Sequence, residues 1–117
     1  MNPQNTDCIF CKIIAGEIPS QMAYRDKDVA VFADIKKDVP VHLLVVPVKH
    51  IPSLATTSDA DMPLVGKMAA AAKKVAAEKG LADKGYRLTM NIGADGGQDV
   101  QHIHIHLMGG RPLKWEN

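Results

Sequence analysis

The stretch QHIHIHLMGG, residues 101–110, constrains this chain more than any other part of its sequence. It places His102, His104 and His106 in strict alternation with three aliphatic residues, although the whole chain has only five histidines. Alternation with a period of two is typical of a β-strand, whose successive side chains point to opposite faces. We therefore expect the aliphatic side chains to face a core and the imidazoles to share the other face, about 7 Å apart.

Three histidines on one strand face call for a chemical explanation. Solvent-exposed strand faces more often carry Thr, Lys, Glu and Arg, and an expression tag would be contiguous rather than alternating. Imidazole titrates near neutral pH, binds metal ions and acts as an acid, a base or a nucleophile. The motif therefore indicates metal ligation, acid–base chemistry or nucleophilic chemistry.

Size and charge limit the classes of protein to consider. The chain has 117 residues, of which 46% are hydrophobic and 23% charged, and its net charge is +1. These values fit one globular domain over residues 1–117, with a flexible N-terminus at 1–6 and a C-terminal tail at 109–117 in which Trp115 is anchored. No basic stripe, membrane-length apolar run or secretion signal is evident, so we expect a soluble cytoplasmic protein without a nucleic-acid or membrane partner.

Local patterns along the chain predict a mixed set of helices and strands. The expected elements are a helix over 7–16 capped by Thr6 or Asp7, a hairpin of strands 22–25 and 29–34, a buried strand over 42–47, a helix over 57–80 capped by Thr57 or Ser58, and a strand over 86–92 before the histidine strand. Hairpin-like connections favour an α+β fold with a mainly antiparallel sheet and helices to one side.

The long helix carries a broad apolar stripe rich in alanine. The stripe consists of Val65, Met68, Ala69, Ala72, Val75 and Ala76. Most of it should be core packing. Small side chains also let another backbone approach closely, so part of the stripe could lie at a dimer interface.

A glycine-rich loop precedes the histidine strand. It runs from Asn91 through Gly97 to Gln98, and its glycines would let backbone N–H groups converge on an anion. A simple hairpin turn is the alternative interpretation. No Lys or Arg lies between Asn91 and His106, which favours a single phosphate of low charge over a triphosphate.

Together these motifs resemble the histidine-triad superfamily. HIHIHLM at 102–108 is similar to its His-φ-His-φ-His-φ-φ motif, and CIFCKIIAGEIPS, AVFADI, HLLVVPVKHI and NIGADGGQ resemble segments of its nucleotide-binding branch. The resemblance extends from about Asp7 to Trp115. It implies a five-stranded antiparallel sheet with two helices, a homodimer whose sheet continues across the interface, and hydrolysis of purine nucleoside phosphoramidates, which releases AMP or GMP from an amine.

The same resemblance assigns residues to the expected active site. His104 matches the nucleophile that takes the nucleotidyl group covalently, His106 matches a phosphate contact, and His42 matches a histidine beside the nucleophile. The remaining substrate-binding positions are Asn91 and the backbone of Gly97, Asp99 and Val100 at the phosphate, Gln98 in the same loop, Asp34 at the ribose, and Ile9, Phe10, Ile13, Phe32 and Ile35 at the purine.

One position departs from the family pattern. Asp99 stands where the family commonly has a serine that contacts the phosphate or the leaving group. A carboxylate there would repel the substrate anion unless it were protonated or turned away.

The two cysteines form a single C-x-x-C motif at Cys8 and Cys11. A redox pair would normally lie in a thioredoxin-like βαβ context, which this pattern lacks, and two reduced helix cysteines are a further alternative. His50 and His102 have no catalytic assignment, and one subgroup of the family binds zinc through such a Cys-Cys-His-His set. We therefore expect a structural zinc, with no metal needed for catalysis.

Two other functions remain open on the sequence alone. One is a catalytic zinc on the three alternating histidines, which would make the protein a zinc-dependent hydrolase. The other is a non-catalytic module that binds purine nucleotides or proteins, for which Asp99 is the main argument.

Overall fold

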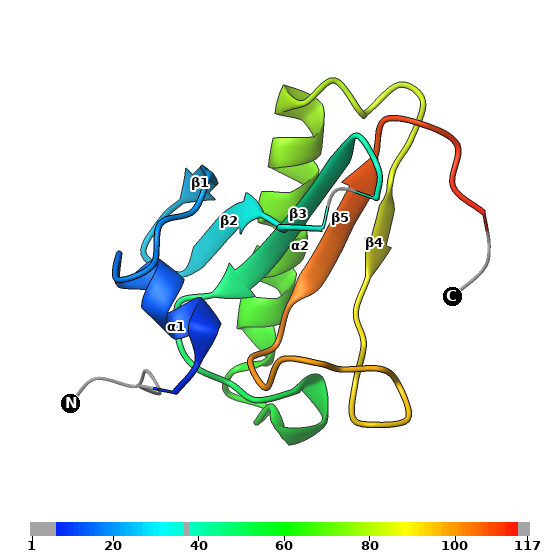
Figure 1. The fold of residues 1–117 in the computed structure, drawn as a ribbon. Coiled ribbons are helices and arrows are strands. Elements are labelled where there is room, and N and C mark those ends of the chain that lie inside the picture. Colours follow the sequence, from blue (N-terminus) through cyan, green and yellow to red (C-terminus); the bar gives the residue numbers. More distant parts are fainter. Residues whose placement is uncertain (1–6, 37, 115–117) are drawn as a thin grey trace.

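A five-stranded antiparallel sheet forms the centre of the molecule in this computed structural model, which describes residues 7–36 and 38–114 (Figure 1). The strand order is β1-β2-β3-β5-β4. The helices are α1 (Ile9–Ile14), η1 (Leu54–Thr56, a 3₁₀ turn) and α2 (Met62–Glu78), and the strands are β1 (Met22–Arg25), β2 (Val29–Ala33), β3 (Val41–Pro47), β4 (Arg87–Thr89) and β5 (Ile105–Gly109). The predicted α+β class is confirmed.

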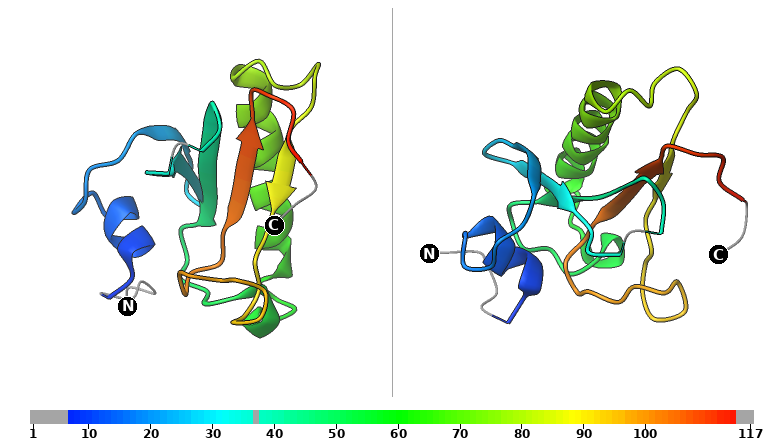
Figure 2. Two further views of the ribbon diagram at one scale, coloured as in Figure 1. Left: turned by 45° about the vertical axis from the view of Figure 1, so that its right-hand side comes forward. Right: turned by 45° about the horizontal axis from the view of Figure 1, so that its top comes forward.

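The two faces of the sheet are covered by different helices (Figure 2). Val29 and Val31 of β2 pack in the core against α2, whereas the alternate residues Ala30 and Phe32 pack against α1. Because both faces are covered, β2 and the middle of β3 are apolar at consecutive positions. The expectation that both helices lie to one side was therefore wrong.

The histidine segment has the predicted alternation. Ile103, Ile105 and Leu107 are buried in the core against α2. His106 pairs with Leu44 of β3, and this register turns the imidazole face toward the side of the sheet that holds α1. The paired strand begins only at Ile105, so His102 and His104 lie in the segment that leads into β5.

Helix boundaries differ from the predicted ones because the capping residues are used elsewhere. Cys8 caps α1 in place of Asp7, since the Cys8 sulfur accepts from the backbone N–H of Cys11. The α2 helix starts at Met62 because Thr57 bonds back to the carbonyl of Ser53, while Ser58 accepts from the N–H of Asp61 in the preceding turn. Pro63 falls in the first turn of α2, where a missing N–H is tolerated.

Within α2, the buried face is Met68, Ala71, Ala72, Val75 and Ala76. Ala69, which we placed in the core stripe, is exposed instead. The expected strand over 86–92 is paired only at Arg87–Thr89. The expectations for residues 1–6, including Thr6 as a cap, and for Trp115 lie outside the described residues. No helix in the described ranges has the length and apolarity needed to cross a membrane.

Candidate active site and metal centre

A cleft of about 450 Å³ opens on the face of the sheet that carries the histidines. It is lined by twelve of the fourteen residues proposed for catalysis and substrate binding. These are Ile9, Phe10, Ile13, Phe32, Asp34, Ile35, His42, Asn91, Asp99, Val100, His104 and His106. Strand pairing brings β3 beside β5, and α1, β2, β4 and the 91–100 loop supply further walls. The fold therefore gathers segments that are distant in the sequence into one site.

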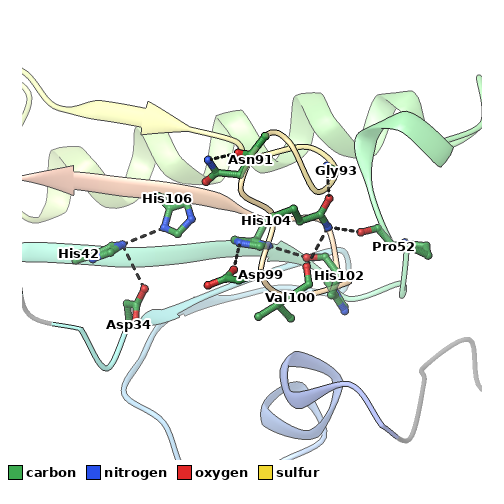
Figure 3. A network of polar contacts seen from close by, with 12 residues as sticks. Asp34, His42, Pro52, Asn91, Gly93, Asp99, Val100, His102, His104 and His106 are labelled. Carbon is green, nitrogen blue, oxygen red and sulfur yellow. Dashed lines mark hydrogen bonds and ion pairs between the residues drawn. The ribbon is translucent and has the colours of Figure 1, made fainter. Parts of the chain in front are cut away.

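His104 is held in a single orientation at the buried end of this cleft. Its side chain is 2% exposed, and its ring lies edge-on to Phe10, with centroids 5.2 Å apart. Nδ1 of His104 lies 2.7 Å from the carbonyl oxygen of His102 (Figure 3). A carbonyl only accepts, so Nδ1 carries the proton and Nε2 of the neutral ring keeps its lone pair.

The Nε2 atoms of His104 and His106 are both open to the cleft. Neither atom forms a protein hydrogen bond within the described residues. Within the described residues, every fully buried side-chain nitrogen or oxygen has a hydrogen-bond partner. Because the two Nε2 atoms have none, each of them must have accessible surface. A substrate that enters the cleft can therefore meet these two nitrogens.

His106 belongs to a second set of contacts with His42 and Asp34. Nδ1 of His106 lies 3.0 Å from Nε2 of His42, which also lies 3.3 Å from a carboxylate oxygen of Asp34. Burial lowers the pKa of His106, and the neighbouring His104 and His42 lower it further against the opposing effect of Asp34 and Asp99. His106 is therefore mainly neutral near pH 7.

The glycine-rich loop is shaped by two amide side chains. Asn91 donates to the carbonyl of Gly96 at 2.8 Å, and Gln98 accepts from the N–H of Gly93 at 3.0 Å. Gln98 also donates to the carbonyls of Pro52 and Val100 and is buried, so its amide holds the loop rather than facing the cleft. Gly97, at φ +80°, occupies backbone space that favours glycine.

Asp99 lies at the mouth of the cleft, close to the nucleophile candidate. One of its oxygens is 3.9 Å from Nε2 of His104, and its side chain is 67% exposed. A phosphate bound to His104 would therefore lie close to this carboxylate. This position agrees with the repulsion of the substrate anion that the sequence predicts.

A compact cluster of four potential metal ligands lies at the start of α1 and consists of Cys8, Cys11, His50 and His102. Their four potential ligand atoms lie within 4.8 Å of one another. His102 Nδ1 is 3.3 Å from the Cys8 sulfur and 3.2 Å from His50 Nδ1. His102 Nε2 donates to the carbonyl of Pro47 at 2.9 Å, so its Nδ1 lone pair points into the cluster. Burial lowers the pKa of His102 to about 4, which keeps this ring neutral.

The three alternating histidines do not share one metal site in residues 7–36 and 38–114. His102 turns its free nitrogen to the cysteines, His104 bonds to a carbonyl, and His106 bonds to His42. A second group of potential ligands consists of Asp34, His42 and His106. The contacts of His42 with Asp34 and with His106 already explain why these side chains lie close together. The geometry thus offers no support for a catalytic zinc on the triad.

Some cleft residues escaped the sequence analysis. Arg87 and Thr89 of β4 line the cleft beside Met108 of β5. Their alternation with Asn91 is a strand pattern that could have identified them. Asp38, which bonds His42 at 2.8 Å, lies in a loop without periodicity and carried no such pattern.

Comparisons with known proteins agree with this geometry. The family described as "Scavenger mRNA decapping enzyme C-term binding" matches residues 7–114. The purine nucleoside phosphoramidase of Escherichia coli K12 is 46% identical over 107 residues, which cover 92% of this chain and 90% of the relative.

Solved structures share the whole fold. A histidine triad protein from Clostridium difficile superposes with a TM-score of 0.94 at 43% identity, covering 97% of this chain and 99% of that one. A zinc-bound histidine triad family protein from Mycobacterium smegmatis superposes with a TM-score of 0.78 at 32% identity, covering 90% and 76% of the two chains. With its His102–His104–His106 motif and the sheet beside it, this chain belongs to the histidine-triad superfamily.

Proposed function

We propose that this protein hydrolyses purine nucleoside phosphoramidates through a covalent nucleotidyl intermediate on His104. The observation that carries the proposal is the fixed tautomer of His104, whose Nδ1 is bonded to a carbonyl while its Nε2 faces the cleft. The 46% identical relative from Escherichia coli, which bears the name of this activity, supports the same reaction.

The reaction would proceed in two displacements at phosphorus. The Nε2 lone pair of His104 attacks phosphorus, the P–N bond breaks, and the departing amine takes up a proton from solvent. Water then attacks the nucleotidyl-histidine and gives up a proton to solvent, the bond from phosphorus to Nε2 breaks, and a nucleoside monophosphate leaves. In the intermediate the ring carries positive charge, which the carbonyl of His102 stabilises through the Nδ1 proton.

The rest of the cleft would bind the nucleotide. His106 and the backbone of Gly97, Asp99 and Val100 would contact the phosphate, since Nε2 of His106 is accessible there. Asp34, which also lines the cleft, would bind the ribose. The apolar wall of Ile9, Phe10, Ile13, Phe32 and Ile35 would hold the purine, AMP and GMP being the candidate nucleotides.

We propose that the Cys8, Cys11, His50 and His102 cluster binds one structural zinc ion. A tetrahedral zinc with Zn–N of about 2.05 Å and Zn–S of about 2.3 Å separates its nitrogens by about 3.3 Å and each sulfur from a nitrogen by about 3.6 Å. The cluster has a nitrogen pair at 3.2 Å and sulfur–nitrogen pairs at 3.3 and 3.5 Å. With four protein ligands no position is left for substrate, so the ion would fix α1 to the sheet.

We also propose a homodimer. The β4 strand is an edge of the sheet, and Leu88 on it is 41% exposed. On α2, Gly66, Ala69 and Ala70 are exposed small residues that allow close approach of a second helix. A second copy pairing along β4 and α2 would cover both surfaces.

The test of function is the turnover of adenosine 5′-phosphoramidate by the purified protein, followed as release of AMP. Release that depends on the protein and saturates with substrate is expected. If the protein binds AMP but releases none from the phosphoramidate, the second candidate is correct: a non-catalytic nucleotide-binding module. The proximity of Asp99 to His104 is the observation that favours this alternative.

A further inference from the structure

The α1 helix contributes residues to two different sites at once. Its cap and first turn read Cys8–Ile9–Phe10–Cys11, in which the two cysteines belong to the metal cluster while Ile9 and Phe10 line the cleft. Ile13, one turn further along, also lines the cleft. Three of the five residues of the proposed purine wall therefore lie on the same short segment as two of the four proposed metal ligands.

The ring of Phe10 packs against histidines of both sites. Its centroid lies 5.8 Å from that of the proposed metal ligand His102 and 5.2 Å from that of the proposed nucleophile His104, edge-on in both cases. It also meets the ring of Phe32, on the purine wall, with centroids 5.5 Å apart. Because Phe10 is buried among close-packed rings, it cannot shift without changing the shape of the cleft beside it.

The first turn of α1 needs support from other segments. A helix of six residues is too short to be stable in water by itself. The Cys8 sulfur lies 3.3 Å from Nδ1 of His102, and the Cys11 sulfur lies 3.3 Å from Nδ1 of His50, but hydrogen bonds of sulfur are weak. A zinc ion bonded to all four groups would join this turn firmly to two distant segments of the chain.

The other end of α1 and the ring of His104 are held by contacts that need no metal. Arg25 of β1 donates to the carbonyl of Ile14. His102 is fully buried and its Nε2 donates to the carbonyl of Pro47, so the backbone that orients His104 is anchored to β3. A metal ion in the cluster would therefore act on the first turn of α1 rather than on the nucleophile.

We propose that a metal ion in the four-ligand cluster strengthens the binding of purine nucleotides, because it fixes the turn that carries Ile9 and Phe10 of the purine wall. Coupling between two binding sites is reciprocal, so a bound purine nucleotide strengthens the binding of the metal by the same factor. The coupling acts on affinity and not on the chemical step at His104. This inference rests on the proposed zinc ion and on the proposed function.

Calorimetry measures the coupling on the wild-type protein. The Kd of AMP is compared for the zinc-loaded protein, for the same protein after chelator treatment, and after one equivalent of zinc is added back. We expect chelator treatment to raise this Kd about tenfold, within the usual range of coupling between sites, and zinc to restore it. With adenosine 5′-phosphoramidate, KM should rise while kcat stays within about twofold. Equal Kd values with and without zinc would overturn the proposal.

The reciprocal measurement uses equilibrium competition between the protein and a chromophoric zinc chelator. Saturating AMP should strengthen zinc binding by about tenfold, the factor expected for AMP binding itself. A zinc affinity that is the same with and without AMP would contradict the coupling.

A matched pair of variants tests the route through α1. Ile9 and Ile35 both line the cleft and are exposed, at 47% and 95%, but only Ile9 lies on α1. Ile9→Ala and Ile35→Ala should each weaken AMP binding, so the quantity to compare is the ratio of the Kd without zinc to the Kd with zinc. This ratio should fall to about threefold in Ile9→Ala and stay at about tenfold in Ile35→Ala. Equal ratios in the two variants would exclude the route through α1.

Hydrogen exchange separates a local effect on α1 from general unfolding. After chelator treatment, the backbone amides of α1 (residues 9–14) should exchange faster, whereas those of β3 (residues 41–47) should keep their protection. Faster exchange in both elements would mean that metal removal unfolds the sheet, and the proposed coupling through α1 would be wrong.

These measurements also show which proposal has failed. A protein that takes up no zinc ends this inference together with the zinc proposal, and a protein that binds no AMP ends it together with the proposed function. Equal affinities in a protein that binds both zinc and AMP would overturn the coupling alone.

Discussion

The ring of His104 is oriented by the backbone of His102, because Nδ1 of His104 donates to the His102 carbonyl at 2.7 Å. His102 also turns its own Nδ1 toward Cys8 and His50. The proposed nucleophile therefore lies two residues from His102, one of the four proposed metal ligands. The side chain of His102 would complete the proposed metal site, and its carbonyl fixes the tautomer of His104.

Replacing the nucleophile should separate binding from chemistry. His104→Ala is expected to lower kcat for adenosine 5′-phosphoramidate by several orders of magnitude, since it removes the nitrogen that would form the intermediate. Binding of AMP, measured by calorimetry, should persist because His106 and the apolar wall remain. A variant that keeps about a tenth of the wild-type rate would disprove covalent catalysis by this residue.

Metal analysis tests the structural zinc. Protein purified without chelators or a histidine tag should contain one zinc per chain, and Cys11→Ser should lose most of it because the sulfur ligand is removed. Its melting temperature should fall to that of chelator-treated wild-type protein, since metal binding is coupled to folding. The treated wild type should keep its catalytic activity while it stays folded. A wild-type content below about a fifth of an equivalent would contradict the assignment.

The charge of Asp99 should slow the reaction. Two unit charges about 4 Å apart interact by roughly 1 kcal/mol in water and roughly 4 kcal/mol at an effective dielectric of 20. Because this side chain is 67% exposed, we expect the lower figure to apply and kcat/KM of Asp99→Ser to rise up to about tenfold, less so at high salt.

Two leaving groups distinguish repulsion of phosphate from recognition of the amine. Relief of repulsion should improve the rates of a neutral and a cationic leaving group alike. A loss of rate confined to the cationic substrate would show that Asp99 contacts the amine.

Acid should destabilise the fold partly through His106. Its pKa is lowered by burial in the folded state, whereas an unfolded histidine titrates near 6.5. Below about pH 6.5 the unfolded chain therefore binds more protons than the folded chain. The stability that the neutral His106 ring contributes to the fold is complete above that pH and is lost as the pH falls. In urea titrations between pH 7.5 and 5, the unfolding free energy of His106→Asn should fall less steeply with pH than that of the wild type. The two slopes should differ by at most about 1.4 kcal/mol per pH unit. Equal slopes for the two proteins would contradict the shift.

The predicted dimer can be measured directly. Light scattering at micromolar concentration should give twice the chain mass of 12.7 kDa. Leu88→Lys places a charge at the exposed edge strand and should shift the mass toward one chain. A single-chain mass for the wild-type protein would rule out the dimer.

Local alternation predicted the faces of the histidine strand because a strand has a period of two. Ile105 and Leu107 are buried as expected, and His104 and His106 face the cleft. The buried strand over 42–47 was also predictable, since its apolar run reflects covering on both sides. The side of the sheet taken by α1 was not predictable, because a short amphipathic helix fits either face.

Other parts of the site depend on contacts between distant segments. Cys11 and His50 are separated by 39 positions yet lie 3.3 Å apart, and only the family resemblance placed them together. The contact between Asp38 and His42 depends on the conformation of an irregular loop, which no periodic pattern encodes. Gln98 was assigned to the substrate, whereas its three hydrogen bonds show that it supports the loop.

The most direct test of the account is mass spectrometry of protein that is acid-quenched during turnover of adenosine 5′-phosphoramidate. We expect a transient adenylyl adduct that peptide mapping places on His104, the residue whose Nε2 faces the cleft. The adduct should be absent from His104→Ala and should decay as AMP is released. Turnover at the full rate without any adduct on His104, or with the adduct on His106, would contradict the account.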